Sequence, residues 1–277
     1  MKRLFIIVVA LLATILNVEA REIKVLAIGN SFSMDVVEQH LHELGKAEDV
    51  TIIAGNLYIG GCHLQKHLSN LRSEKKAYEY RKVGDDGKRR KYKKYSIQDG
   101  LEDEQWDYIM VQQVSGLSGV YASFNKYMPE YMSLLRSLTP YKPKFIIMQT
   151  WAYQGNSEHT NFSLYDYNQM KMYKAVTKTY DKVFKDKKYD FFALVPNGTA
   201  IQNGRTYFGD VLTRDGYHLD LKVGRYLSAC TLCEVLLGKS IVGNSYRPKG
   251  MSENDALMAQ KAAHAAVLKP TKITKIK

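Results

Sequence analysis

Val25-Leu26-Ala27-Ile28-Gly29-Asn30-Ser31-Phe32-Ser33 joins an apolar run to a helical pattern. Residues 23–28 are short and almost continuously apolar, which predicts a strand covered on both faces. Beyond Ser33, apolar residues recur at helical spacing until Gly45, which predicts one helix ending at that glycine. Ser31 is therefore expected on a strand-to-helix turn, with its N–H at the positive end of the helix.

The rest of the chain repeats this alternation of apolar runs and helical patterns. Further strands are predicted at 50–53, 108–111, 145–148 and 191–195, and further helices at 64–71, 127–138, 168–184, 222–237 and 254–268. Strands that alternate with helices favour a parallel sheet with helices on both faces. We therefore expect a single flavodoxin-like, three-layer α/β/α domain.

The first twenty residues have the pattern of an export signal. Lys2 and Arg3 precede the apolar run 4–16, and small residues follow at Val18-Glu19-Ala20. We expect residues 1–20 to be a signal peptide, so that the protein is exported to the periplasm or the cell exterior. No stable membrane insertion is then expected after signal removal, although a retained N-terminal anchor is the alternative. The main domain is assigned to 21–245 and a helical, Lys-rich tail to 246–277.

The formal net charge is +12, and much of the excess lies in one segment. Residues 77–95 carry a Gly-Asp-Asp-Gly turn between basic, tyrosine-containing arms, which predicts an inserted β-hairpin. Charge runs are usually solvated faces, and the alternative is that this hairpin holds an anionic substrate. No base-reading motif is present, so a nucleic-acid partner is not expected.

The cysteines and histidines do not form a recognisable metal-binding pattern. Cys230 and Cys233 lie on the apolar face of a predicted helix, so we expect them to pack in the core, and Cys62 stands alone. His63 and His67 have no neighbouring carboxylates or further histidines in the sequence. We therefore predict no metal and no cofactor.

Ser31, Asp215 and His218 are the candidate nucleophile, orienting acid and base. Asp215 precedes His218 by three residues, a spacing at which one turn of chain presents both side chains together. Gly-Asn-Ser recurs at 155–157 and 243–245, but only the copy at 29–31 lies between a predicted strand and helix. The alternative role for Ser31 is a helix cap. The flanking residues are not the Gly-x-Ser-x-Gly elbow of α/β-hydrolases.

Two segments resemble the end motifs of the SGNH (GDSL-like) hydrolase superfamily. Residues 29–33 resemble its first block, with Asn30 where many members carry Asp, and residues 215–219 resemble its last block. Residues 58–64 look like the second block, whose glycine N–H helps to bind the oxyanion. The resemblance spans about residues 23–237 and implies an SGNH-like hydrolase domain that acts on esters.

The third block departs from the superfamily pattern. Residues 106–116 stand where Gly-x-Asn-Asp is usual, and Gln112-Gln113-Val114-Ser115 is similar instead to an uncharacterised exported subgroup. By this resemblance, the oxyanion would be held by the N–H groups of Ser31 and Gly61, with Gly60 the rival of Gly61. A third donor would be the amide of Gln113, with Gln112 as the alternative.

Four residues are expected to line the substrate site. Trp151 follows the fourth strand and offers an indole for stacking on a sugar, or else caps the core. Asn197 follows the last strand and either lines the pocket or makes a turn. Asn30 and Gln112 complete this set.

The expected function is a serine esterase that deacetylates a carbohydrate or glycan, with a small-molecule or glycan ester as its partner. The carbohydrate rests on analogy with the resembled superfamily. An acyltransferase would use the same triad to acylate a sugar hydroxyl. A glycan-binding protein without catalysis is the alternative from another class, and the altered third block favours it.

Overall fold

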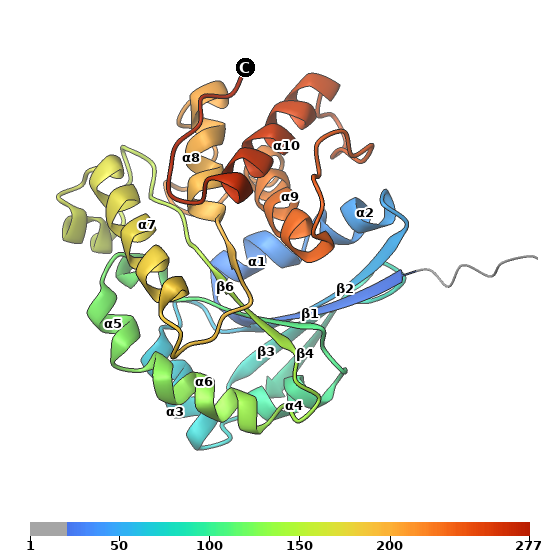
Figure 1. The fold of residues 1–277 in the computed structure, drawn as a ribbon, viewed down its shortest axis with the longest axis vertical. Helices are drawn as coiled ribbons and strands as arrows, with labels where there is room; N and C mark the ends of the chain where they lie inside the picture. Colours follow the sequence, from blue (N-terminus) through green and yellow to red (C-terminus); the bar gives the residue numbers. More distant parts are fainter. Residues whose placement is uncertain (1–20) are drawn as a thin grey trace, which may run out of the picture.

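The computed structural model describes residues 21–277, which form a single seven-stranded sheet between two helical layers (Figure 1). The strands are β1 (Arg21–Gly29), β2 (Val50–Tyr58), β3 (Tyr78–Val83), β4 (Arg89–Tyr95), β5 (Tyr108–Val111), β6 (Lys144–Met148) and β7 (Ala193–Val195). Their order is β4-β3-β2-β1-β5-β6-β7. The strands β2, β1, β5, β6 and β7 are parallel, in the order of a flavodoxin-like sheet, so the predicted fold is confirmed.

Helices cover both faces of the sheet (Figure 1). The helical segments are α1 (Ser31–Val37), α2 (Leu41–Lys46), α3 (Leu64–Arg72), α4 (Ile97–Glu102), η1 (Ser115–Leu117), α5 (Tyr121–Asn125), α6 (Met128–Ser137), η2 (Thr160–Tyr165), α7 (Gln169–Lys185), α8 (Asn197–Phe208), α9 (Val223–Leu237) and α10 (Glu253–Leu268). In Figure 1, α1, α2 and α9 lie on one side of the sheet, and α3, α4 and α6 lie on the other.

The predicted strands and long helices agree with the structure because their apolar side chains are buried. The middle of β1, from Val25 to Ile28, is at most 1% exposed, as expected for a strand between two helical layers. The main error in length is β2, which continues five residues beyond the predicted end at Ile53 and reaches Tyr58. This extension matters because it places Tyr58 in register with Gly29, two residues before the candidate nucleophile Ser31.

The predicted hairpin exists, but it continues the sheet instead of standing apart from it. β3 pairs antiparallel with β2, and β4 pairs antiparallel with β3 at the edge of the sheet. Tyr78 and Tyr80 on β3 are buried, whereas β4 is exposed along most of its length. The sequence pattern predicts the turn, but the pairing of β3 with β2 depends on contacts that are distant along the chain.

The single helix predicted after β1 is broken into α1 and α2. His40 adopts a left-handed backbone conformation with φ of 66°, which interrupts the helical hydrogen bonds, and its imidazole Nδ1 lies 2.9 Å from the Tyr246 hydroxyl. Gly45 lies inside α2 and does not end it. A Cβ atom at Gly45 would come within 2.6 Å of Ile52, so the glycine is explained by close packing of α2 against β2.

Helix α8 was not predicted from the sequence. Its residues include two glycines, which lower helix propensity. Its apolar residues also show only a weak helical periodicity. Gly204 lies so close to α9 that a Cβ atom would come within 2.5 Å of Leu227. The helix is therefore stabilised by close packing on α9, which a single-sequence pattern does not reveal.

The C-terminal segment, expected as a tail, packs onto the domain through α10. Seven residues of α10 are buried, and the helix lies against α8 and α9. The amide of Asn203 on α8 donates to the Ala262 carbonyl, and the amide of Gln260 donates to the Tyr226 hydroxyl on α9. This helix is therefore an integral part of the domain and packs in one layer with α8 and α9.

The three cysteines are free and buried, and the core packing predicted for Cys230 and Cys233 is confirmed. Burial raises the pKa of the Cys62 thiol to about 12, which keeps this sulfur protonated and unreactive. None of the helices among residues 21–277 is both long and apolar enough to cross a membrane. The predicted signal peptide, residues 1–20, lies outside the described residues.

The packing of α10 predicts a large effect of one substitution on stability. Ala262→Glu places a charge at a fully buried position, and we expect it to lower the stability by at least about 3 kcal/mol and the Tm by about 6 °C or more. The measurement is thermal unfolding followed by circular dichroism, with Lys261→Glu, at the neighbouring half-buried position, as the control. Equal Tm values for the two variants would mean that α10 is a dispensable tail.

Candidate active site

The candidate site lies where the order of the parallel strands reverses. β1 pairs with β2 on one side and with β5 on the other, so the carboxyl ends of these strands mark a topological switch point, where open α/β sheets bind ligands. Ser31 comes two residues after β1, and Gln112 comes directly after β5. The structure therefore places Ser31 of the first block and Gln112 of the third block just beyond two adjacent strands.

Asn30 connects the first, second and third sequence blocks through its side chain. Its Oδ1 accepts hydrogen bonds from the Phe32 N–H at 3.0 Å and from the Gln112 amide at 2.7 Å. Its Nδ2 donates to the carbonyl of Cys62 at 2.9 Å. Asn30 is thus the N-cap of α1, and it holds the first, second and third blocks together.

Ser31 is the first residue of α1, and its hydroxyl is not needed as a helix cap. Asn30 performs the capping, and within residues 21–277 the Ser31 hydroxyl makes no hydrogen bond. The side chain is half-buried and so remains reachable from solvent. The Ser31 N–H lies in the first turn of α1, where backbone N–H groups have no partner within the helix. Both groups are therefore available to a ligand.

Asp215 and His218 contact each other through a tight turn. The His218 Nδ1 lies 2.7 Å from Asp215 Oδ2, and Asp215 Oδ1 accepts a hydrogen bond from the His218 N–H at 2.8 Å. Gly216 between them has φ of 87°, a conformation that favours glycine. The Asp-Gly-x-His spacing therefore forms a turn in which one carboxylate binds both the backbone and the ring of the histidine.

The carboxylate sets which nitrogen of His218 is free. Burial acts to raise the pKa of Asp215, but the hydrogen bonds from the His218 ring and backbone outweigh it and hold that pKa below its ordinary value. An ionised carboxylate only accepts hydrogen bonds, so Nδ1 carries the hydrogen. Nε2 is then left with a lone pair, as a general base requires.

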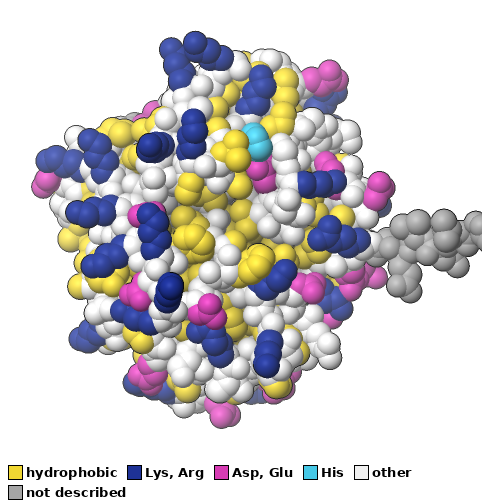
Figure 2. Space-filling view, in the orientation of Figure 1, with side chains coloured by type: hydrophobic (Ala, Val, Ile, Leu, Met, Phe, Trp, Pro, Cys, Tyr) yellow, Lys and Arg dark blue, Asp and Glu magenta, His cyan; other side chains and the backbone are white. Residues whose placement is uncertain are grey.

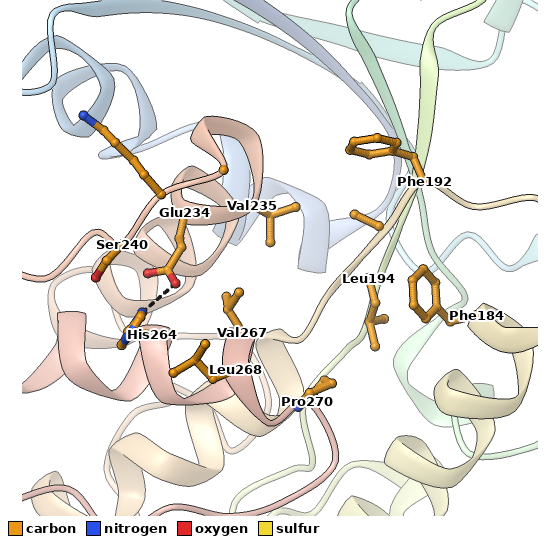
Figure 3. Close-up of a pocket in the computed structure, with 13 residues that line it drawn as sticks. Phe184, Phe192, Leu194, Glu234, Val235, Ser240, His264, Val267, Leu268 and Pro270 are labelled. Carbon is orange, nitrogen blue, oxygen red and sulfur yellow. Dashed lines mark hydrogen bonds and ion pairs between the residues drawn. The ribbon is translucent and has the colours of Figure 1, made fainter.

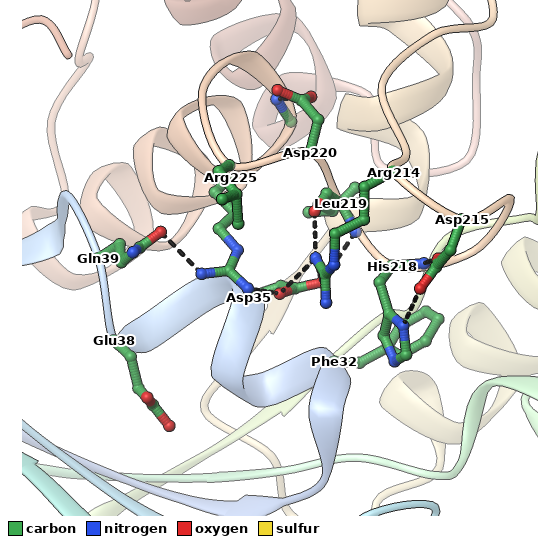
Figure 4. Close-up of polar contacts among 12 residues, drawn as sticks. Phe32, Asp35, Glu38, Gln39, Arg214, Asp215, His218, Leu219, Asp220 and Arg225 are labelled. Carbon is green, nitrogen blue, oxygen red and sulfur yellow. Dashed lines mark hydrogen bonds and ion pairs between the residues drawn. The ribbon is translucent and has the colours of Figure 1, made fainter. Parts of the chain in front are cut away.

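The buried carboxylate of Asp35 holds the His218 segment against α1 (Figure 4). Asp35 lies one helical turn after Ser31 and is 0% exposed. Its Oδ2 accepts from the Leu219 N–H at 2.8 Å, and its Oδ1 lies 2.5 Å from Arg225 and 3.3 Å from Arg214. The Arg214 guanidinium also donates to the Leu219 carbonyl. These contacts fix the residue after His218 to the helix that begins with Ser31.

The rings around the site show how close the two segments are. The Phe32 ring centroid lies 6.0 Å from that of His218, and Figure 4 shows the two side chains facing each other. Phe32 also stacks on Trp151, with centroids 4.2 Å apart. Among residues 21–277, no hydrogen bond joins the Ser31 hydroxyl to His218.

Gly61 lies in an exposed turn beside Asn30. The Cys62 N–H donates to the Ile59 carbonyl and closes the turn, and Gly61 has φ of 62° with open space at its Cβ position. The bond from Asn30 to the Cys62 carbonyl ties this turn to the start of α1. The position of Gly61 is therefore compatible with an N–H directed at a bound ligand.

The Gln113 amide, which the sequence predicts as an oxyanion donor, makes its hydrogen bonds within the protein in this structure. Its Oε1 accepts from the N–H groups of Leu64 and Val114, and its Nε2 donates to the Ser123 hydroxyl at 3.0 Å. The side chain thereby joins the start of α3 to the segment after β5. Gln113 acts as a positioning residue in this arrangement.

The four residues expected to contact the substrate are all buried: Asn30, Gln112, Trp151 and Asn197 are between 0% and 2% exposed. Trp151 donates through its indole N–H to the Tyr217 carbonyl at 2.7 Å and stacks on Phe32. It therefore holds the residues next to His218 and Ser31 in place. Asn197 begins α8 and makes no turn. Burial leaves these four side chains little surface for a ligand, and their direct contact with a substrate stays a prediction.

A separate apolar cavity of about 510 Å³ lies away from Ser31 (Figure 3). Its walls include Phe192, Leu194 and Val267, with the Glu234–His264 ion pair at one side. Figure 2 shows hydrophobic side chains in the middle of this face, with Lys and Arg around them. Glu234 is the twelfth residue of α9, so at 1.5 Å per residue it lies about 16 Å along the helix from Val223, the end nearer His218 in the sequence.

Metal ligands do not gather in the described part of the chain. Among residues 21–277, no group of three or more His, Cys, Asp or Glu side chains is arranged to hold a metal ion. His67, one of the histidines considered from the sequence, is buried, and its Nδ1 lies 2.9 Å from the Tyr78 hydroxyl.

The family described as "Domain of unknown function (DUF4886)" matches residues 24–266. The chain belongs to this family. A crystal structure of a DUF4886 family protein from Bacteroides uniformis is 47% identical, with a TM-score of 0.89, and the match covers 92% of this chain and 98% of that one. No curated protein matches the sequence.

A putative SGNH hydrolase from Slackia heliotrinireducens is also similar in structure. It is 16% identical with a TM-score of 0.51, and the match covers 77% of this chain and 98% of that one. At this identity the likeness concerns the fold, and it shows that this DUF4886 member has the α/β/α architecture of SGNH hydrolase-like proteins.

Sequence patterns did not reveal Asp35, Arg214 and Arg225. The available signal was an acidic residue on the apolar face of a predicted helix, four residues after Ser31, which calls for a buried partner. The identity of the partners could not be read, because they lie about 180 residues further along the chain.

Asp35→Asn is expected to be strongly destabilising, because it leaves two guanidinium groups without their buried counter-charge. We expect a loss of about 3 kcal/mol or more and a fall in Tm of about 6–12 °C. Thermal unfolding measures the effect, and Asp181→Asn, which breaks an exposed pair with Lys185, is the matched control with a loss of at most about 0.5 kcal/mol. Similar losses for both variants would show that the Asp35 cluster does not hold the segment.

Proposed function

We propose that this DUF4886 family member is a serine esterase in which Ser31, His218 and Asp215 act as the triad. The observation that carries the proposal is the Asp215–His218 pair, held by Asp35 against the helix at whose start the Ser31 hydroxyl is uncommitted. A nucleophile, a base with a free nitrogen and an orienting carboxylate are the groups that acyl transfer requires. The SGNH-like fold supports the same reaction class.

In the proposed reaction, His218 Nε2 takes the proton of the Ser31 hydroxyl while Oγ attacks the ester carbonyl. The oxyanion is held by the N–H groups of Ser31 and Gly61. As the tetrahedral intermediate collapses, His218 gives its proton to the departing alcohol and the acyl group stays on Ser31. His218 then takes a proton from a water molecule that attacks the acyl-enzyme. As the second tetrahedral intermediate collapses, His218 returns this proton to the Ser31 oxygen, and the acid is released.

The proposed substrate is an acetylated carbohydrate, and the proposed location is outside the cytoplasm. The signal-like pattern of residues 1–20 supports export to the periplasm or the cell exterior, where glycan esters are available. The resemblance of the end blocks to SGNH hydrolases supports an ester as the reacting group. The proposed chemistry uses protein groups and water alone.

Ser31→Ala is the decisive substitution for catalysis. It removes the attacking oxygen, so we expect the rate of aryl-acetate hydrolysis to fall about a thousandfold or more. The matched control is Ser245→Ala, because Ser245 also follows Gly-Asn but lies in an exposed loop. If Ser31→Ala and Ser245→Ala hydrolyse the ester at the same rate as the unmodified protein, Ser31 is not the nucleophile.

Asp215→Asn tests the orienting role of the carboxylate. The amide cannot accept the ring hydrogen as well as a carboxylate does, so we expect kcat to fall about 100-fold with a small change in KM. The effect is smaller than for a fully buried partner because the Asp215 side chain is 39% exposed. Steady-state kinetics measure it, and an unchanged kcat would remove Asp215 from the triad.

A further inference from the structure

An aromatic wall stands directly beside His218, and we define it as Tyr153, His159 and Tyr217. The Tyr217 ring centroid lies 4.2 Å from that of His218 and 4.6 Å from that of His159. Tyr153 lies 4.7 Å from His159 and 5.8 Å from Tyr217. Tyr153 is fully buried, whereas His159 and Tyr217 are half-buried, so these last two form the accessible part.

Hydrogen bonds between two loops hold the aromatic wall in place. The Gln154 N–H donates to the Gly216 carbonyl at 2.8 Å, and the Trp151 indole donates to the Tyr217 carbonyl at 2.7 Å. Behind them, the Tyr153 hydroxyl lies 2.8 Å from that of Ser115. The wall is therefore formed before any ligand binds, which reduces the entropy cost of binding.

The edge of the wall presents a hydrogen-bond donor. His159 Nδ1 accepts a hydrogen bond from the Asn161 N–H at 3.2 Å, so in the neutral ring the hydrogen is on Nε2. Burial and the neighbouring His218 lower the pKa of His159, and Asp215 opposes this only in part. The ring is thus neutral at neutral pH and adds no positive charge beside the catalytic base.

We propose that His159 and Tyr217 form a subsite that binds a sugar ring, the alcohol part of the ester substrate. The subsite rests on the proposed function, because it assigns one component of that substrate to one side of His218. The Tyr217 ring packs against the C–H face of the sugar, and His159 Nε2–H donates to a sugar hydroxyl.

The position of the wall follows from the chemistry of the proposed reaction. His218 must give its proton to the oxygen of the departing alcohol, so that oxygen lies within hydrogen-bond reach of Nε2. The group attached to this oxygen therefore lies beside His218, where Tyr217 and His159 are. The acyl group lies instead toward Gly61, on the oxyanion side.

The chemistry of the wall selects a sugar among alcohols. A pyranose has an apolar C–H face and a rim of hydroxyl groups, and an aromatic ring next to a fixed N–H donor matches both. A purely aliphatic alcohol would leave the His159 donor without a partner. Trp151, expected from the sequence to stack on a sugar, instead fixes the loop that carries Tyr217.

Binding measured without catalysis tests the subsite. In the Ser31→Ala background, calorimetry is performed with xylopentaose, mannopentaose, cellopentaose and chitopentaose, each separately. We expect at least one to bind, and we expect added Tyr217→Ala or His159→Ala to weaken that binding on the order of tenfold. Tyr217→Phe keeps the ring and is expected to bind as the background protein does.

The matched control is Tyr92→Ala, which removes a tyrosine that is 40% exposed on the far edge strand β4 and should leave sugar binding unchanged. Thermal unfolding of every variant separates lost folding from lost binding. Undiminished binding by folded Tyr217→Ala, or no binding of any oligosaccharide to the background protein, would overturn the subsite. Ester hydrolysis by Ser31→Ala would overturn the proposed function instead, without affecting this measurement.

Discussion

The buried carboxylate of Asp35 is the contact on which the geometry of the candidate site depends. It is a fully buried charge, and it is compensated by Arg225, Arg214 and the Leu219 N–H, which all come from the C-terminal third of the chain. Burying such a charge is costly without partners, so folding can bury Asp35 only when this segment has docked. The position of His218 relative to Ser31 is therefore coupled to the folding of the whole domain.

Asn30 has the complementary role at the other end of α1. A helix of seven residues is marginal by itself, so its position must come from tertiary contacts. Asn30 fixes its first turn to the glycine turn and to Gln112, and Asp35 fixes its last turn to the His218 segment. Asn30 and Asp35 are five residues apart, and together they fix the position of Ser31 relative to the second, third and last blocks.

Sequence patterns predicted what depends on local spacing and missed what depends on distant partners. The parallel strands and the amphipathic helices followed from periodicity, and the Asp215–His218 contact followed from a separation of three residues. The glycine-containing α8 and the docking of α10 were not predictable, because both depend on packing against α9. The two roles left open for Trp151, stacking on a sugar or capping the core, could not be separated for the same reason, since its burial follows from stacking on Phe32.

The altered third block has a physical consequence for the oxyanion site. If the Gln113 amide turned toward a substrate, the N–H groups of Leu64 and Val114 would lose their acceptor, at a cost of about 1–3 kcal/mol for each buried group. A single side-chain donor to an oxyanion is worth only about 3–4 kcal/mol, so the gain and the loss nearly cancel. In the proposed reaction, the oxyanion is therefore assigned to backbone N–H groups and not to the Gln113 amide. The rigidity of the Asn30 hydrogen bonds matters accordingly, since they fix both the α1 turn and the Gly61 turn.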